Sequence, residues 1–284
     1  MERLWAPAAG IPVHRLDAGR LADCLELAAD RGWPREEHKW RLLFDIGEVY
    51  GITDPDGRLV ASAVLTRYGP GLCAISMVLV AERLDGQGLG RRLMSEILAL
   101  TGDAVVTLYA TSFGRPLYEK LGFTLVCDNV THVGRFETAD EVEVSRPAVA
   151  EDLPGIIELD REVHGADRSG LVSRLPSFCS QLRVIDGERG ITGYAGAWDN
   201  IDKVVAGPVV AADATAAKGL LADLAKAAAA PVRLEVLHEF GEVGAWAVSR
   251  GLAPTGTTSL MVLGGRELPG DAARRFSPVS VALG

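Results

Sequence analysis

The sequence predicts an α/β fold made of two consecutive domains, each built on a mixed β-sheet. The chain has 284 residues, which is more than one hydrophobic core usually holds. Strands and helices are expected in the same order twice, at a period of roughly 130 residues, which indicates a diverged internal repeat. Residues 75–80 are apolar at nearly every position, as is typical of a central strand covered on both faces. Two copies of one fold are the simplest explanation.

The first half is predicted to begin with a short strand at Val13 and a helix whose start is signalled by Asp17. The segment Arg31-Gly-Trp-Pro34 ends that helix, and turn signals at 54–57 and 69–71 separate three strands. The other elements expected here are helices at 36–46, 88–100 and 115–121, strands at 48–53, 59–66, 72–80 and 104–110, and a strand after residues 122–123.

An acidic segment at 137–143 interrupts the apolar pattern and separates a first domain, residues 1–138, from a second, residues 139–284. The second domain is predicted to repeat the order of the first. Its expected elements are strands at 142–146, 181–186, 190–198, 203–210, 232–237 and 259–263, and helices at 152–163, 171–175, 216–229 and 241–250.

The composition limits the classes of partner. There are 29 Lys and Arg against 38 Asp and Glu, a formal charge of −9, so no overall basic field attracts a phosphate backbone. Cys24, Cys73, Cys127 and Cys179 form no CxxC pair, which favours free thiols in a reducing compartment and no metal site. The sequence shows neither a signal-peptide pattern nor a membrane-length apolar run. We expect a cytoplasmic protein that binds neither nucleic acid nor membranes.

A glycine-rich loop, Gly86-Gln-Gly-Leu-Gly90, lies between an apolar strand and the start of a helix. Glycines there let backbone N–H groups point into a concavity, and the positive end of the helix dipole attracts a phosphate. Arg91 and Arg92 add positive charge in the first turn. Taken alone, the three glycines are also compatible with a simple tight turn. Neither the dinucleotide-binding nor the P-loop pattern is present.

A second motif, Leu117-Tyr-Glu-Lys-Leu-Gly-Phe123, follows the loop at a suitable spacing. Together the two motifs resemble the GNAT superfamily of acyl-CoA N-acyltransferases, and the repeated element order is similar to its bacterial tandem subgroup. The resemblance therefore implies two tandem GNAT-like domains. The motifs cover only the first half, so the second half resembles the family by element order alone.

The resemblance also implies a site for acetyl-CoA as co-substrate. The edge of the strand would bind the pantetheine amides, the glycine loop would hold the pyrophosphate, and a residue after the next strand would contact the pantetheine arm. Tyr118 would protonate the leaving CoA thiolate, because a protonated thiolate is a better leaving group. The implied cofactor-binding residues are Val78, Leu79, Val80, Asp85, Gly86, Gln87, Gly88, Leu89, Gly90, Arg91 and Ser112.

Two features depart from the family pattern. Asp85 stands where the family has Arg or Gln, and a carboxylate there repels a pyrophosphate unless it turns outward or Arg91 offsets it. The general base is not evident, and Asp45, Glu48 and Glu82 are candidates by neighbourhood only. By resemblance, Trp33, Trp40 and His38 lie in the helical region that walls the acceptor groove, where packing in the core or at the rim is an equally good interpretation.

The second half has lost the motifs. Alignment by element places Ala247 where the first half has Tyr118, and alanines with Asp213 replace the glycine turn. We therefore expect a degenerate domain that serves as a lid or as one wall of the acceptor site. Asp167, Arg168 and Tyr194 are polar residues that would face that groove, or else lie on the surface.

The leading hypothesis is an N-acetyltransferase that transfers the acetyl group directly to a primary amine of a small molecule or peptide. A non-catalytic acyl-CoA sensor or scaffold is the alternative. A relative of the tandem enzymes that make low-molecular-weight thiols is a third hypothesis, but in those enzymes the resemblance assigns the chemistry to the second domain. The sequence leaves a monomer and a homodimer equally open.

Overall fold

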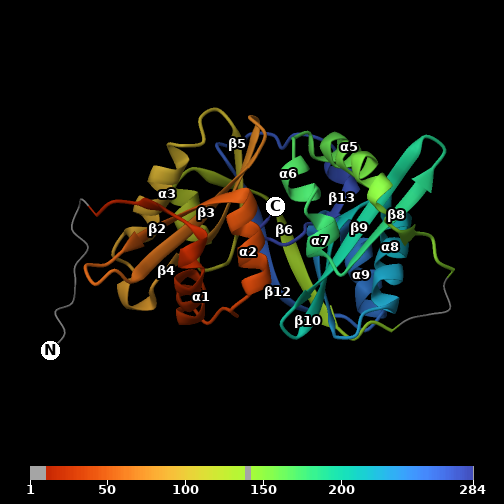
Figure 1. Ribbon diagram of the computed structural model, residues 1–284, viewed down its shortest axis with the longest axis horizontal. Helices are drawn as coiled ribbons and strands as arrows, with labels where there is room; N and C mark the ends of the chain where they lie inside the picture. Colours follow the sequence, from red (N-terminus) through yellow and green to blue (C-terminus); the bar gives the residue numbers. More distant parts are fainter. Residues whose placement is uncertain (1–10, 138–141, 284) are drawn as a thin grey trace.

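The structure is a computed structural model and describes residues 11–137 and 142–283. The predicted boundary between residues 138 and 139 therefore lies outside the described residues. The first half of the chain lies on the left in Figure 1 and the second half on the right, with β6 and β12 between them.

One continuous sheet runs through both halves, in the order β1-β2-β3-β4-β5-β12-β6-β11-β10-β9-β8-β7, and β13 pairs with β10. The first-half strands are β1 His14–Leu16, β2 Gly47–Thr53, β3 Leu59–Tyr68, β4 Leu72–Val80, β5 Val105–Ala110 and β6 Phe123–Gly134. The second-half strands are β7 Arg146–Pro147, β8 Gln181–Gly187, β9 Gly190–Asn200, β10 Lys203–Val210, β11 Val232–Leu237, β12 Ala253–Leu263 and β13 Arg275–Ser277.

The helices lie between these strands, as the sequence predicts. In the first half they are α1 Leu21–Asp30, α2 Glu37–Ile46, α3 Leu89–Leu98 and α4 Arg115–Lys120. In the second half they are α5 Leu153–His164, α6 Ser169–Val172, α7 Leu175–Phe178, α8 Ala214–Lys226 and α9 Gly241–Ser249. Short 3-10 turns add η1 Ala18–Arg20, η2 Glu82–Leu84, η3 Ala150–Asp152, η4 His238–Phe240 and η5 Ala272–Arg274.

The two halves exchange strands at the centre of the sheet. β6 of the first half pairs with β11 of the second, with Val130 opposite Val236. Conversely, β12 of the second half pairs with β5 of the first, with Met261 opposite Leu108. Because β12 and β6 also pair with each other, the sheet has no edge at the junction between the halves. The sequence did not predict this exchange.

Most predicted elements are confirmed to within a few residues, and the predicted strand at 142–146 is the main exception. Only Arg146 and Pro147 pair as a strand. The backbone N–H groups of Val144 and Ser145 instead donate to the Asp223 carboxylate, at 3.1 and 3.0 Å. A side chain of α8 therefore replaces a strand partner for this segment.

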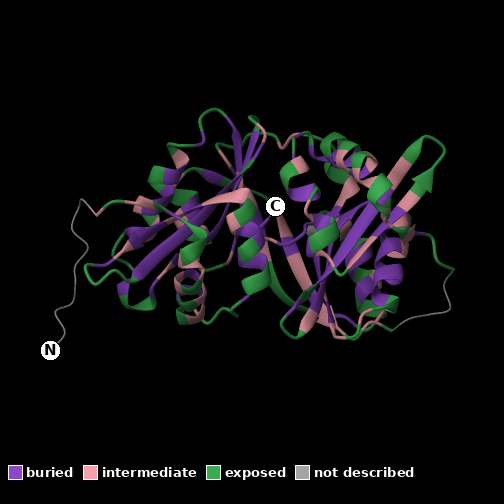
Figure 2. Cartoon of the chain, viewed as in Figure 1, coloured by how far each residue is buried: buried purple, intermediate pink, exposed green. Residues whose placement is uncertain are grey.

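Helices cover both faces of the sheet. In β3 every residue except Arg67 is buried, whichever face its side chain points to. Figure 2 shows the same continuous burial along the central strands of both halves. The apolar strands therefore form a rigid core that holds the loops at the ends of β4 and β5 in place.

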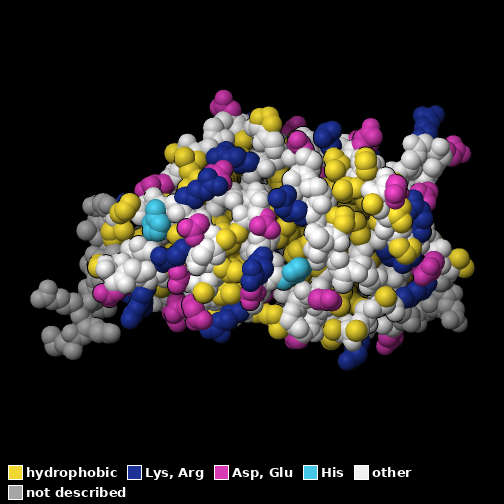
Figure 3. All heavy atoms as spheres, in the orientation of Figure 1, with side chains coloured by type: hydrophobic (Ala, Val, Ile, Leu, Met, Phe, Trp, Pro, Cys, Tyr) yellow, Lys and Arg dark blue, Asp and Glu magenta, His cyan; other side chains and the backbone are white. Residues whose placement is uncertain are grey.

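The surface and the cysteines agree with the composition. On the face shown in Figure 3, acidic and basic side chains are interspersed. All four cysteines are free thiols, as predicted; Cys24 and Cys73 are buried, and Cys127 and Cys179 are half-buried. Of the helices in the part of the chain that the structure describes, none has the length and apolar character needed to span a membrane.

Candidate active site

The site begins where two parallel strands part. β4 and β5 pair only from Leu72↔Val105 to Ala74↔Thr107, although β4 continues to Val80 and β5 to Ala110. Beyond Ala74, the edge of β4 that faces β5 has no partner strand among the described residues. Peptide groups along this edge are therefore available to a ligand.

A β-bulge shapes the free part of β4. Met77 and Val78 together oppose the single residue Ala63 of β3, and Met77 has a positive φ of 49°. The Ser62 hydroxyl donates to the Met77 carbonyl oxygen at 3.2 Å. Bulges bend a strand and redirect its peptide groups, so this one turns β4 away from β5.

The predicted glycine loop leads directly into α3. Gly86 and Gly88 have φ values of 74° and 82°, which glycine adopts without the cost that other residues pay. A side chain at Gly90 would lie 3.3 Å from Leu117 and 3.5 Å from Val80, so this glycine allows α3 to pack closely on α4 and β4. Backbone angles thus favour glycine at residues 86 and 88, and close packing favours it at residue 90.

The start of α3 presents unpaired donors. Gly88 is its N-cap and supplies no side-chain hydrogen bond. The first hydrogen bond within the helix runs from the Arg92 N–H to the Gly88 carbonyl oxygen, so the N–H groups of Leu89, Gly90 and Arg91 precede the helical ladder. The exposed Arg91 side chain makes no ion pair with any described residue. This combination suits an anionic group such as a pyrophosphate.

Asp85, which departs from the family pattern, is paired within the protein. Its carboxylate accepts a hydrogen bond of 2.8 Å from Arg31, the residue that follows α1. The Arg31 guanidinium also lies 5.2 Å from the centre of the Phe113 ring. The negative charge beside the glycine loop is thus offset by a cation, although by Arg31 rather than by Arg91.

A cavity of about 640 Å³ joins the strand edge, the glycine loop and α4. Ten of the predicted site residues line it: Val78, Leu79, Val80, Asp85, Gly86, Gly88, Leu89, Gly90, Arg91 and Tyr118. Gln87 and Ser112 do not line it and are exposed. Thr111, the residue before Ser112, lines the cavity instead, and Ser112 lies in the turn that follows it.

Tyr118 lies in this cavity on α4 and is 7% exposed. Its ring meets Phe123 edge-on at 6.0 Å between centroids. A side chain at Gly114 would lie 3.0 Å from the tyrosine ring, so that glycine makes room for it. Burial raises the pKa of Tyr118 well above its usual value, and the phenol therefore keeps its proton at neutral pH.

The residues predicted as base candidates lie elsewhere. Asp45, Glu48 and Glu82 line neither this cavity nor the one described next. The Glu48 carboxylate accepts hydrogen bonds from Tyr50 at 2.6 Å and Arg67 at 2.7 Å. Although burial opposes it, these hydrogen bonds lower the pKa of Glu48, which makes it a weaker base.

The three residues predicted to wall the acceptor groove in the first half do not lie together. Trp33 lines the 640 Å³ cavity. Trp40 is fully buried in the core. His38 stacks on Phe178 of the second half, at 4.3 Å between ring centroids, and its Nε2 lies 2.9 Å from the Phe178 carbonyl oxygen. Trp40 and His38 therefore hold the two halves and the core together rather than wall a groove.

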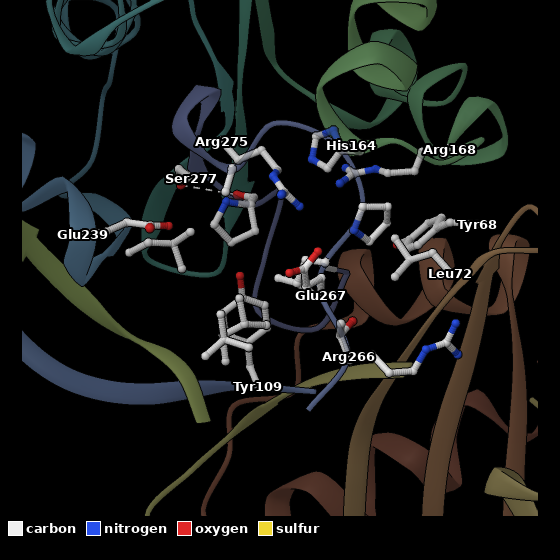
Figure 4. A pocket seen from close by; sticks show the side chains of 18 residues that line it. Tyr68, Leu72, Tyr109, His164, Arg168, Glu239, Arg266, Glu267, Arg275 and Ser277 are labelled. Carbon is white, nitrogen blue, oxygen red and sulfur yellow. Dashed lines mark hydrogen bonds between the residues drawn. The ribbon is translucent and has the colours of Figure 1, made fainter. Parts of the chain in front are cut away.

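A second cavity, of about 400 Å³, lies at the junction of the two halves. We call it the junction cavity, and Figure 4 shows its lining side chains. Arg168 lines it, as predicted. Asp167 is exposed outside it, and Tyr194 is buried and donates to the Asp160 carboxylate at 2.5 Å. Tyr109 of β5 lines both cavities.

Several lining residues of the junction cavity were not predicted: Thr107, Tyr109, Glu239, Glu267 and Arg275. Only some of these five residues could have been predicted from a local sequence pattern. Thr107, Tyr109 and Thr111 alternate at period two in an apolar strand, which predicts one polar face. Glu239, Glu267 and Arg275 reach the cavity through the strand exchange, which leaves no local pattern.

The second half does not present the same features. Asp213 caps α8 by accepting a hydrogen bond of 2.9 Å from the Ala216 N–H. Ala247, at the position aligned with Tyr118, is completely buried. Among the described residues, no group of three or more His, Cys, Asp or Glu could hold a metal ion.

Family models match both halves of the chain. A GNAT acetyltransferase domain model matches residues 46–125, and a different GNAT acetyltransferase domain model matches residues 156–277. The chain is also 25% identical over 235 residues to the uncharacterized N-acetyltransferase YitH of Bacillus subtilis, covering 79% of this chain and 82% of that protein.

Solved structures share the whole fold. A putative acetyltransferase from Pyrococcus horikoshii matches with a TM-score of 0.83 at 16% identity, over 100% of this chain and 99% of that one. A tandem GNAT protein from the clavulanic acid biosynthesis pathway matches with a TM-score of 0.64 at 13% identity, over 91% of this chain and 100% of that one. At these identities the likeness concerns the fold.

Proposed function

The chain belongs to the GNAT acetyltransferase family, with one GNAT domain in each half, and we propose that its first half transfers an acetyl group from acetyl-CoA to a primary amine of a small molecule or peptide. The observation that carries this proposal is the 640 Å³ cavity. It brings together the unpaired edge of β4, the glycine start of α3 and the buried phenol of Tyr118.

The residues present fit acetyl-CoA. The edge of β4 at Val78, Leu79 and Val80 offers peptide groups to the pantetheine amides. The N–H groups of residues 88–91 and the charge of Arg91 suit the pyrophosphate. The Arg31–Asp85 pair keeps the one carboxylate of this loop from acting as an isolated negative charge.

The chemistry needs one proton donor and no covalent enzyme intermediate. Acetyl-CoA supplies the acetyl group as a thioester. The neutral amine forms a C–N bond to the carbonyl carbon while the C–S bond breaks. The thiolate takes a proton from Tyr118, the amine nitrogen releases one proton to water, and water returns a proton to the phenolate. Backbone N–H groups of β4 would stabilise the developing negative charge on the carbonyl oxygen.

A carboxylate at residue 85 would favour the alternative of a non-catalytic sensor if it repelled the pyrophosphate. Asp85 pairs with Arg31, so it does not support that alternative. The two functions differ in one measurement. Both predict that acetyl-CoA raises the melting temperature, whereas only the enzyme releases CoA thiol when amines are supplied. No shift at saturating acetyl-CoA would contradict both.

Replacing Tyr118 with Phe tests the mechanism. We expect kcat to fall by about 100-fold with the Kd for acetyl-CoA unchanged, because a positioned general acid contributes at least that much and the phenol forms no hydrogen bond within the described residues. Thiol release measures kcat, and calorimetry measures the Kd.

Tyr50→Phe is the matched control, because Tyr50 lines neither cavity and donates only to Glu48. It should leave kcat unchanged. Full activity in the Tyr118 variant would exclude this tyrosine as the proton donor.

A further inference from the structure

We infer that the junction cavity binds the acceptor, and that this acceptor is an amine that also carries a carboxylate. The inference rests on the proposed function, because it names the substrate class that the acetyl group reaches.

The position of the cavity suits an acceptor. Thr107 and Tyr109 lie at alternate positions of β5, so their side chains share one face, and Thr111 directly follows the strand. Thr107 lines the junction cavity, Thr111 lines the 640 Å³ cavity, and Tyr109 lines both. A molecule in the junction cavity and acetyl-CoA in the larger cavity would therefore meet at Tyr109. In Figure 4 the Tyr109 hydroxyl points into the junction cavity.

Arg275 is a cation without a partner. Its side chain makes no hydrogen bond or ion pair with any described residue, and one terminal nitrogen is buried without a partner. In Figure 4 its guanidinium points into the cavity. Arg275 as a whole is half-buried, but a buried nitrogen without a hydrogen bond costs free energy unless a ligand supplies the acceptor.

Arg168 is a second cation that lines the junction cavity. It is 3% exposed, and its guanidinium lies 5.3 Å from the centre of the Tyr68 ring. It forms an ion pair with Asp160, with 3.5 Å between its Nε and the carboxylate, but no hydrogen bond joins the two groups, so its hydrogen-bonding capacity toward the cavity is not used by Asp160. Burial and the charge of Arg168 lower the pKa of Arg275, although Tyr109, Glu239 and Asp271 oppose that shift, so the two cations repel each other. An anion between them would relieve that repulsion.

The cavity also carries two carboxylates. Glu239 and Glu267 line it, are exposed to solvent, and make no ion pair with any described residue. His164 adds no positive charge, because burial and the charge of Arg168 lower its pKa to about 4. Arg266 points away in Figure 4 and donates to the Asp103 carbonyl oxygen at 2.5 Å.

Two cations and two anions in one cavity fit a molecule with one charge of each sign. The carboxylate of the acceptor lies against Arg275 and Arg168, since guanidinium groups bind carboxylates through paired hydrogen bonds. Its ammonium lies toward Glu239 and Glu267, whose carboxylates accept the proton that the ammonium loses before it attacks the thioester. The volume of about 400 Å³ admits a small molecule of this kind.

Matched amine pairs test the inference on the whole chain. The first pair is L-lysine and cadaverine, the second L-phenylalanine and 2-phenylethylamine, and each pair differs by one carboxylate. We expect kcat/KM, measured by thiol release, to favour the carboxylated member at least tenfold. Phosphoethanolamine, an amine that carries a phosphate instead of a carboxylate, is tested alongside. A higher kcat/KM for it than for both amino acids would contradict the inference that the cavity binds a carboxylate.

Arg275→Met should raise KM for the carboxylated member by about 10- to 100-fold, the usual loss for a hydrogen bond to a charged group. The KM of the amine without a carboxylate and the Kd for acetyl-CoA should not change. Arg274→Met is the matched control, because Arg274 pairs with Glu162 and lines neither cavity. Equal losses for both members of a pair, or none, would overturn the inference.

Binding is measured separately so that the two proposals can fail independently. Carboxylated amines that raise the melting temperature in the presence of CoA, without turnover, support the acceptor site and contradict the acetyl transfer. Turnover of amines without preference for a carboxylate supports acetyl transfer and contradicts the acceptor class. The melting temperature of the Arg275 variant alone should equal or exceed that of the wild type.

Discussion

The two halves of the molecule open their sheets in the same place and use the opening differently. In the first half, β4 and β5 pair from Leu72↔Val105 to Ala74↔Thr107 and then part around a cavity. In the second half, β10 and β11 pair from Val204↔Val232 to Ala206↔Leu234 and then also part.

The second opening is filled by the chain itself. β13 pairs with the end of β10, with Ser277 opposite Val209. A side chain at Gly207 would lie 2.1 Å from the Pro278 carbonyl oxygen, so the segment after β13 runs directly against β10. The fold supplies an opening between two strands in each half, and the residues placed there decide whether it takes a ligand.

The helices that follow show the same contrast. Gly88 leaves the start of α3 without a side-chain cap, whereas the Asp213 carboxylate caps α8. An anionic ligand is expected at the first helix, and an anionic side chain already occupies the second. We therefore expect a ligand at the start of α3, whereas at the start of α8 the equivalent N–H groups are capped by a side chain.

The largest effect is expected from emptying the second opening. Phe276 is 2% exposed and contacts Phe240 in a tilted arrangement, with 4.4 Å between ring centroids. Phe276→Ala should lower the free energy of unfolding by about 3–5 kcal/mol, as for other buried phenylalanines. Chemical denaturation measures this loss, and the Kd for acetyl-CoA should stay the same. Weaker acetyl-CoA binding in a variant that remains folded would show that the second half also binds the co-substrate.

A smaller effect is expected from giving α3 the cap that α8 has. Gly88→Asp should weaken acetyl-CoA binding about 100-fold, roughly 3 kcal/mol, because the carboxylate would take the free N–H groups and repel the pyrophosphate. Calorimetry measures the Kd. The control is Gly57→Asp, since Gly57 has nearly the same φ, 81°, in a turn that does not line the cavity. Equal effects of both variants would mean that backbone strain, not charge, is responsible.

The smallest effect is expected from removing the cap of α8. Asp213→Ala should cost about 1 kcal/mol of stability, the usual value for an N-cap, and leave acetyl-CoA binding unchanged. Thermal and chemical denaturation measure the loss. If this variant gained a second acetyl-CoA site in calorimetry, the carboxylate alone would have been blocking the second half.

Much of the fold follows from local patterns. Alternating and continuous apolar runs predict β2 to β5 and β8 to β11 because side-chain burial repeats every two residues in a strand. The glycine loop is also local, since Gly86 and Gly88 are required by their own backbone angles. The Arg31–Asp85 pair and the exchange of β6 and β12 join residues far apart in the chain, and no local pattern predicts them.

By itself, the sequence determined the repeat, the glycine loop before α3 and the position of Tyr118, because each depends on neighbouring residues. Only the tertiary structure decided that the two halves exchange β6 and β12, that the chain fills its own second opening, and that Arg168 and Arg275 line one cavity. These features depend on long-range packing, which joins elements far apart in the chain and leaves no periodic signal in either segment.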